Sequence, residues 1–189
     1  MLHFKLVQHF VNRGYLAKDT VMMDVGTQNL LYVELDAAVE MVNSLRAKKM
    51  TKKDRERLEE VVYFSTPRAG ERTAFLHELL ELTDVTYESI DIVDGWKTTI
   101  FDLNFDAVPE EWQGHFDFVL NCGTLEHVIN QSNALDFIHK CLKVDGMWFD
   151  QPPSVGFLNH GYYNYNPLFY LDFAAANGYD VEEAWYSHA

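Results

Sequence analysis

Apolar and polar residues follow two patterns along the chain, one with helical spacing and one typical of strands. In the helical pattern apolar residues recur every three or four positions, as Phe4, Val7 and Phe10 do. The helices predicted in this way cover residues 3–16, 32–45, 50–63, 71–82, 133–142 and 168–177. Short apolar or alternating runs predict strands over residues 20–26, 85–92, 98–103, 115–121, 146–150 and 179–186.

The order of these elements predicts the fold class. Helices and strands alternate, which favours an α/β fold of the Rossmann-like, doubly wound type: a mostly parallel sheet with helices on both faces. The 189 residues suit a single domain. Within it we distinguish an N-terminal helix in residues 1–17, a helical insert after the first strand in residues 31–70, and a long loop at residues 152–167.

Residues that favour helix ends lie at several of the predicted boundaries. Gly14 and Gly178 follow two of the predicted helices, and glycine often ends a helix in the left-handed conformation. Thr51 and Asp54 are spaced as a variant capping box at the start of the charged helix. These residues support the helix boundaries that the apolar pattern predicts.

Composition and charge narrow the possible partners. The net charge is −14, which argues against nucleic acid, because proteins that bind it neutralise phosphates with Lys and Arg. The dense basic stretch at residues 46–57 is interleaved with acids and is interpreted as a solvated helix face. Cys122 and Cys141 lack metal-binding spacing and suggest a reducing compartment. No apolar run reaches the length of a membrane span, so we expect a cytoplasmic protein.

Candidate chemistry lies where the predicted strands end. Ligands of doubly wound sheets bind outside the carboxyl ends of the strands, near the point where the strand order reverses. Asp24 and Gly26 end the first strand, and glycine lets the backbone approach a ligand closely. Asp91 ends the second strand, where a carboxylate can accept both hydroxyls of a ribose. Asp102 ends the third strand and can accept from an exocyclic amine, although Asp-Leu-Asn is also a plain turn sequence.

The chain resembles the class I S-adenosylmethionine-dependent methyltransferases over about residues 18–186. The resemblance depends on five short motifs that occur in the family's order. They are Asp24-Val-Gly26, Ser89-Ile-Asp91, Asp102-Leu103, Phe116-Asp-Phe-Val-Leu-Asn121 followed by Glu126-His127-Val128, and Leu142-Lys-Val-Asp-Gly146. The chain departs from the family in its first motif, which has one glycine instead of three. It also departs in the 67 positions between Asp24 and Asp91, which imply the helical insert.

The resemblance implies S-adenosylmethionine as the cofactor and assigns roles to the strand ends. The turn of Gly26, Thr27 and Gln28 would lie under the methionine part, with Asp24 at its amino end. Asp91 and Ile92 would hold the ribose, and Asp102 with the backbone at Leu103 would bind the adenine. Asn121 and Cys122 would face the methionine part through their backbone. Glu126 and His127 would open toward the methyl acceptor as catalytic residues.

Two segments are candidates for the acceptor side. His127 is suited to act as a general base near neutral pH, tuned by Glu126, although both also suit the first turn of a helix. The run from residue 160 to 167 contributes His160, Tyr162, Tyr163 and Tyr165, either as an acceptor-binding loop or as an aromatic loop packed over the sheet edge. A metal held by Glu126, His127 and His160 is less favoured, because adjacent helical residues point apart. We therefore predict no metal.

These inferences predict a methyltransferase that uses S-adenosylmethionine to methylate oxygen or nitrogen of a small molecule: a sugar, phenol or natural-product intermediate. The alternative is a non-catalytic methyltransferase-like binding or scaffold domain, which the single glycine of the first motif favours. A nicotinamide-dependent oxidoreductase would require a Gly-x-Gly-x-x-Gly turn with an acid about 20 residues later, and the sequence shows neither.

Overall fold

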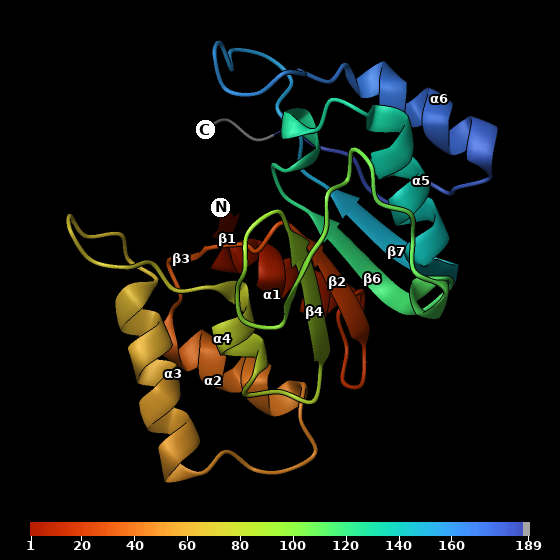
Figure 1. Ribbon diagram of the computed structural model, residues 1–189. Coiled ribbons are helices and arrows are strands. Elements are labelled where there is room, and N and C mark those ends of the chain that lie inside the picture. The colour runs from red at the N-terminus through yellow and green to blue at the C-terminus, as the bar shows by residue number, and fades with distance from the viewer. Residues whose placement is uncertain (187–189) are drawn as a thin grey trace.

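The computed structural model, which describes residues 1–186, contains a parallel sheet of five strands (Figure 1). The sheet has the order β5-β4-β2-β6-β7, and all four strand pairs are parallel. Its strands are β5 (Thr98–Ile100), β4 (Thr86–Asp91), β2 (Val21–Val25), β6 (Phe116–Asn121) and β7 (Leu142–Asp150). The chain thus builds outward from β2 in one direction and then crosses to its other side with β6, which is the order of a doubly wound fold.

Helices cover both faces of this sheet, as the alternation of elements predicts. One face packs against α1 (Phe4–Arg13), α2 (Leu35–Ser44) and α4 (Leu76–Leu80), and α3 (Lys52–Phe64) packs outside α2. The other face packs against α5 (Gln131–Cys141) and α6 (Pro167–Asn177). None of the helices in residues 1–186 is both long and apolar enough to cross a membrane.

The central strands supply side chains to both cores. Met22 and Phe118 point into the core with α1 and α4, whereas their neighbours Met23 and Val119 point into the core with α5. This alternation follows from the two-residue period of a strand, and it explains why the strands are continuous apolar runs in the sequence. The prediction of a parallel sheet buried on both faces is confirmed.

The chain between β2 and β4 is a mixture of helices, loops and a short strand. It holds α2 and α3 together with β3 (Leu30–Leu31), which pairs with β1 (Leu2–His3) in a separate two-residue ladder. Thr51 caps α3, and its reciprocal hydrogen bonds with Asp54 form the predicted capping box. The charged face of α3 is partly exposed and paired, for example between Arg57 and Glu60.

Several predicted elements differ from the structure, and the first correction concerns α4. The amphipathic pattern predicts a helix over residues 71–82, but α4 covers only Leu76–Leu80. The preceding residues are extended, because Ala74 and Leu76 donate their backbone N–H groups to the carbonyls of Phe64 and Gln28. These tertiary backbone bonds replace the first helical turn.

The second correction concerns the last strand, predicted over residues 179–186. This described segment forms no strand. Side chains attach it across α1 instead: Glu183 binds His9 and Tyr15, and the Trp185 ring packs against His9 and Phe149. Because these contacts involve side chains, β7 remains the edge of the sheet.

The third correction concerns β7, which begins at Leu142 rather than at Gly146. The Asp145-Gly146 turn is present, with Asp145 at φ +63°, but it forms an irregularity within the strand. The register shifts there, since Leu142 is opposite Phe116 while Met147 is opposite Phe118. The strand therefore continues on both sides of the predicted turn.

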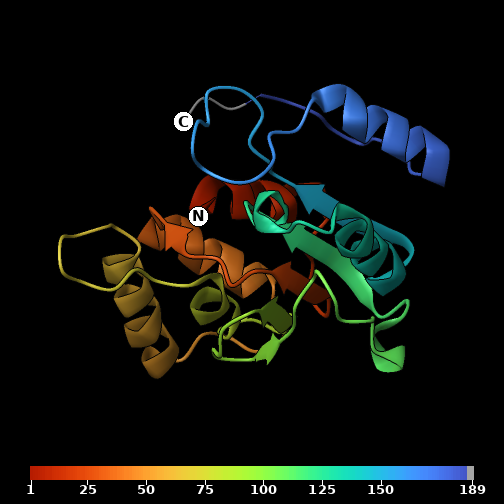
Figure 2. The ribbon, with the colours of Figure 1, turned by 45° about the horizontal axis from the view of Figure 1, so that its top comes forward.

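The strands that carry candidate residues end at the same level. Val25 of β2 is in register with Ile90 of β4 and with Asn121 of β6, and Asn121 is in register with Asp150 of β7. The loops that follow therefore meet at one edge of the sheet, next to the crossing between β2 and β6. Figure 2 shows the segment between β7 and α6 as a wide loop at the top of the view.

Candidate functional site

Asp24 is fully buried in β2 at the crossing point of the sheet. Its Oδ2 accepts hydrogen bonds from the Tyr87 hydroxyl at 2.7 Å and from the Gln28 backbone at 3.0 Å. Its Oδ1 is also buried and has no hydrogen-bond partner within residues 1–186. Burial raises the pKa of Asp24 to about 7, because the ionised form loses its hydration. The site thus contains a buried oxygen without a hydrogen-bond partner among the described residues, and the chain's own N-terminal ammonium group lies near enough to attract the ionised carboxylate.

Gly26 needs to be glycine for two reasons. Its φ is +81°, and a Cβ there would lie 2.2 Å from Thr124 Oγ1. Thr124 lies after β6 and donates its hydroxyl proton to the Val25 carbonyl at 2.7 Å. The close approach that we expected from a ligand is therefore made by a threonine of the neighbouring loop. The turn is fixed by contact between the two central strand ends.

The other residues of this turn are tied to the protein. Gln28 is buried, and its side chain donates to the Gly26 carbonyl at 2.8 Å. Thr27 belongs to a cluster of three hydroxyls with Ser89 and Thr98, in which Ser89 and Thr98 are 2.8 Å apart. The cluster links the loop after β2 and the last part of β4 to the start of β5. It positions the loop that follows Asp91.

Asp91 and Ile92 lie at the end of β4 with part of their surface exposed. Asp91 Oδ1 accepts one hydrogen bond, from the Val93 backbone at 3.3 Å. The Ile92 side chain is 72% exposed. Asp91 is thus partly exposed beside this edge, where the sequence predicted a carboxylate that binds a ribose.

Asp102 forms a turn, the alternative that its sequence context left open. Its Oδ1 accepts from both the backbone and the side-chain amide of Asn104, at 2.9 and 2.8 Å. Leu103 is buried, and its carbonyl accepts from the Asn133 side chain at 2.9 Å. These two residues hold the loop after β5 against the start of α5.

Asn121 is the last residue of β6, and Cys122 follows it at the edge of the sheet. The side chains of both residues are hydrogen-bonded to the protein. Asn121 Oδ1 accepts from the backbone of Thr124 and Leu125, and its amide donates to Asp150. The buried Cys122 thiol donates to Gln151 Oε1 at 3.1 Å, and burial raises its pKa to about 12. The backbone carbonyl of Asn121 also accepts a hydrogen bond, from the Gln151 N–H at 3.0 Å, so the predicted backbone contact of this residue with a ligand would have to use other groups. Burial likewise raises the pKa of Asp150 to about 6.

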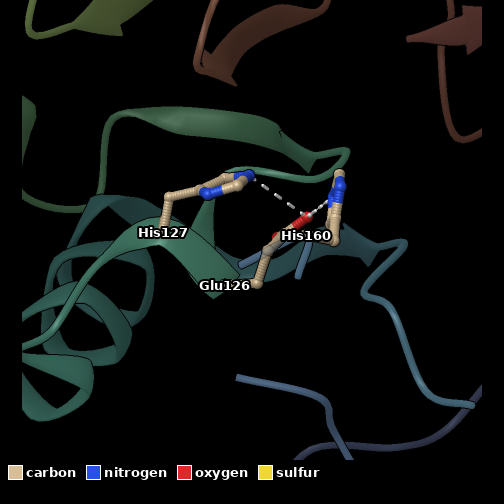
Figure 3. A group of neighbouring side chains, drawn as sticks. All are labelled: Glu126, His127 and His160. Atoms are coloured by element: carbon tan, nitrogen blue, oxygen red, sulfur yellow. Dashed lines mark hydrogen bonds and ion pairs between the residues drawn. The ribbon is translucent and has the colours of Figure 1, made fainter. Parts of the chain in front are cut away.

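Glu126, His127 and His160 form a group beyond the end of β6 (Figure 3). Glu126 and His127 lie in the short 3₁₀ helix η2 (Leu125–His127), and His160 comes from the loop after β7. His160 Nε2 lies 3.2 Å from Glu126 Oε1, and His127 Nε2 lies 3.8 Å from the same oxygen. The two imidazole rings are 5.2 Å apart. The structure therefore brings together two segments that are 34 positions apart, as the sequence led us to expect.

The loop of His160 is attached to the Glu126 backbone. The N–H groups of Tyr162 and Tyr163 donate to the Glu126 carbonyl at 2.7 and 3.3 Å. Gly161 makes this approach feasible, because a Cβ there would lie 2.7 Å from Glu126 Cγ. His160 is thus held over the Glu126 carboxylate by backbone contacts on its C-terminal side.

The three candidate tyrosines differ in their surroundings. Tyr162 is 68% exposed, whereas Tyr163 donates its hydroxyl proton to the Ile129 carbonyl at 3.0 Å. Tyr165 is buried in the core with α5, and its hydroxyl donates to Gln131 Oε1 at 2.6 Å. Tyr165 therefore packs, as the aromatic-loop alternative proposed, and only Tyr162 and Tyr163 face the surface.

Several residues that shape the site were not identified from the sequence. Each of them contacts a residue that the sequence did identify, or a neighbour of one. They are Tyr87, Thr124, Asp150 and Gly161. Asp150 ends a predicted strand, so the rule that identified Asp91 applied to it as well. The contacts of Thr124 and Gly161 depend on which loops meet, and no local pattern signals them.

Two cavities of the described structure lie away from these residues. A hollow lined by Gly14, Lys18, Asp117 and Met147 is at the opposite, amino-terminal edge of the sheet. A second one, lined by Asn43 and Arg46 to Met50, is at the end of α2. Neither involves the strand ends that carry the candidate residues.

No protein-family model, curated protein or solved structure matches this chain.

Proposed function

We propose that the chain is a cytoplasmic methyltransferase that transfers a methyl group from S-adenosylmethionine to oxygen or nitrogen of a small-molecule acceptor. The observation that supports this most is the strand order, with its crossing between β2 and β6. Ligands of doubly wound sheets bind at such a crossing, outside the carboxyl ends of the strands. Two acidic residues with available oxygens, Asp24 and Asp91, lie at this edge.

The residues at the edge fit the cofactor in its methionine and ribose parts. The unpartnered Oδ1 of Asp24, buried among described residues, is an acceptor for an ammonium group, which would also offset the cost of ionising Asp24. Asp91 is accessible for the two ribose hydroxyls. Asp102 is less suited to the adenine, since Oδ1 is already bonded to Asn104. In this proposal the adenine is held by neighbouring backbone.

Where the methyl acceptor would bind, the chain supplies a group that can remove a proton and a surface against which the acceptor can lie. S-adenosylmethionine supplies an activated methyl group, so the protein mainly aligns the acceptor and removes its proton. The His127 side chain is 48% exposed, and its Nε2 lies 3.8 Å from Oε1 of the buried Glu126. Tyr162 and Tyr163 border this position, and their rings can cover an organic acceptor.

The second candidate is a non-catalytic methyltransferase-like binding or scaffold domain. It is favoured by the contact between Gly26 and Thr124, because the space above the glycine turn is taken by protein. In such a domain protein side chains would fill the space beyond the carboxyl ends of the strands, and S-adenosylmethionine would not bind. A binding titration therefore separates the two candidates without knowledge of the acceptor.

Replacing Asp91 with alanine is expected to weaken binding of S-adenosylmethionine by about 10- to 100-fold, since hydrogen bonds to a charged group contribute roughly 1.5–3 kcal/mol. Asp94→Ala is the matched control, because Asp94 is an exposed acid of the same loop. Its dissociation constant should remain that of the wild type. Equal affinities for the wild type and Asp91→Ala would exclude the ribose role of Asp91.

A further inference from the structure

The side chains of Glu126, His127 and His160 converge on one point. One ligand atom from each lies within 4.8 Å of the other two. Both imidazoles present Nε2 to the same oxygen, Glu126 Oε1, at 3.2 and 3.8 Å. Atoms bound to one zinc ion at about 2.0–2.1 Å are roughly 3.3 Å apart in a tetrahedral site. The separations from Oε1 are thus close to those of a shared ion (Figure 3).

The burial of Glu126 is a second, independent indication. Its side chain is 1% exposed, and Oε2 is buried with no hydrogen-bond partner among the described residues. An ionised carboxylate in this position needs a positive partner, and a neutral imidazole bonded to Oε1 is an incomplete one. A cation bound beside the carboxylate would satisfy it.

The surrounding backbone holds these groups before any ion binds. The backbone N–H groups of Tyr162 and Tyr163 hold the loop of His160 to the Glu126 carbonyl, and Gly161 allows the close approach. On the other side, a Cβ at Gly123 would lie 3.2 Å from Glu126 Oε1, so the backbone there also borders the carboxylate. Because two loops fix the ligands, little ordering is required when an ion binds.

We propose that Glu126, His127 and His160 form a binding site for a divalent transition-metal ion of the zinc type. Imidazole nitrogen and carboxylate oxygen are ligands that such ions accept, and two histidines with one glutamate form a known zinc ligand set. The His127 and His160 side chains are 48% and 46% exposed, so the remaining coordination positions face solvent and accept water or an oxygen donor. The sequence predicted no metal because Glu126 and His127 are adjacent. In η2, however, both side chains reach the same point.

The site does not depend on methyl transfer, and its test measures metal binding alone. Zinc is titrated into the full chain after chelator treatment, with the affinity measured by competition against a chromophoric chelator. We expect one equivalent to bind to the wild type. His127→Ala and His160→Ala should bind zinc at least about 100-fold more weakly. Loss of a residue that only hydrogen-bonds to a metal ligand typically weakens metal binding by about 10- to 100-fold, and loss of the ligand itself should cost more.

His115→Ala is the control, because His115 is an exposed histidine at the opposite end of β6. It should retain the wild-type affinity. Circular dichroism checks each fold, and His127→Ala decides the outcome if His160→Ala unfolds, because the His127 ring is half exposed. Cobalt absorption in the visible range should appear in the wild type and be lost in His127→Ala. A wild type without saturable zinc binding, or variants with the wild-type affinity, would overturn the proposal.

Discussion

Replacing Gly26 with alanine is expected to lower the free energy of unfolding by about 3 kcal/mol. A residue with a Cβ at φ +81° is strained, which costs of order 1–3 kcal/mol. The new Cβ also meets Thr124 Oγ1 at 2.2 Å, and such overpacking typically costs a further ~1–3 kcal/mol. Urea denaturation of the wild type and the variant measures the difference.

Two further variants separate the strain from the clash. Gly70 has φ +80°, and a Cβ added there would have no atom of the described residues within 4 Å, so Gly70→Ala should show the strain alone. In a Thr124→Ala background the clashing Oγ1 is absent, and the effect of Gly26→Ala should fall to that of Gly70→Ala. If Gly26→Ala is no more destabilising than Gly70→Ala in the wild-type background, Gly26 and Thr124 do not touch as described.

Replacing His127 with alanine is expected to slow methyl transfer by about 100-fold or more while binding of S-adenosylmethionine is unchanged. The variant removes the proton acceptor in η2, whereas the candidate cofactor residues Asp24 and Asp91 are in β2 and β4. Single-turnover rates and cofactor dissociation constants measure the two effects separately. Metal-free protein is used, because an Nε2 atom bound to a cation cannot accept a proton.

His115→Ala again serves as the control and should transfer methyl groups at the wild-type rate. A loss of cofactor binding that matches the loss of rate in His127→Ala would indicate a structural role for His127. A rate within a few-fold of the wild type would leave another group as the proton acceptor.

The sheet and most helices could be predicted because their signals are local. The central strands are apolar on both faces, and the neighbouring side chains of Met22 and Met23 pack into the two cores on opposite faces of the sheet. The Thr51 capping box depends on residues three positions apart. The segment at residues 179–186 has the apolar content of a strand, but Glu183 and Trp185 attach it through side chains to α1, and this is not visible locally.

The candidate site could be predicted in its location but only partly in its contacts. The rule that ligands bind beyond the strand ends identified Asp24, Asp91 and Glu126. It could not show that Thr124 fills the space above Gly26, because that contact joins loops far apart in the sequence. Nor could it show that Glu126 is buried with one oxygen unpartnered among described residues.

The central claim is that the edge between β2 and β6 binds S-adenosylmethionine. Isothermal titration calorimetry with S-adenosylmethionine and S-adenosylhomocysteine tests it directly on the purified chain. The proposal predicts saturable binding of one equivalent of each, weakened by Asp91→Ala and unchanged by Asp94→Ala. A folded protein that binds neither compound would contradict the methyltransferase proposal and favour the non-catalytic domain.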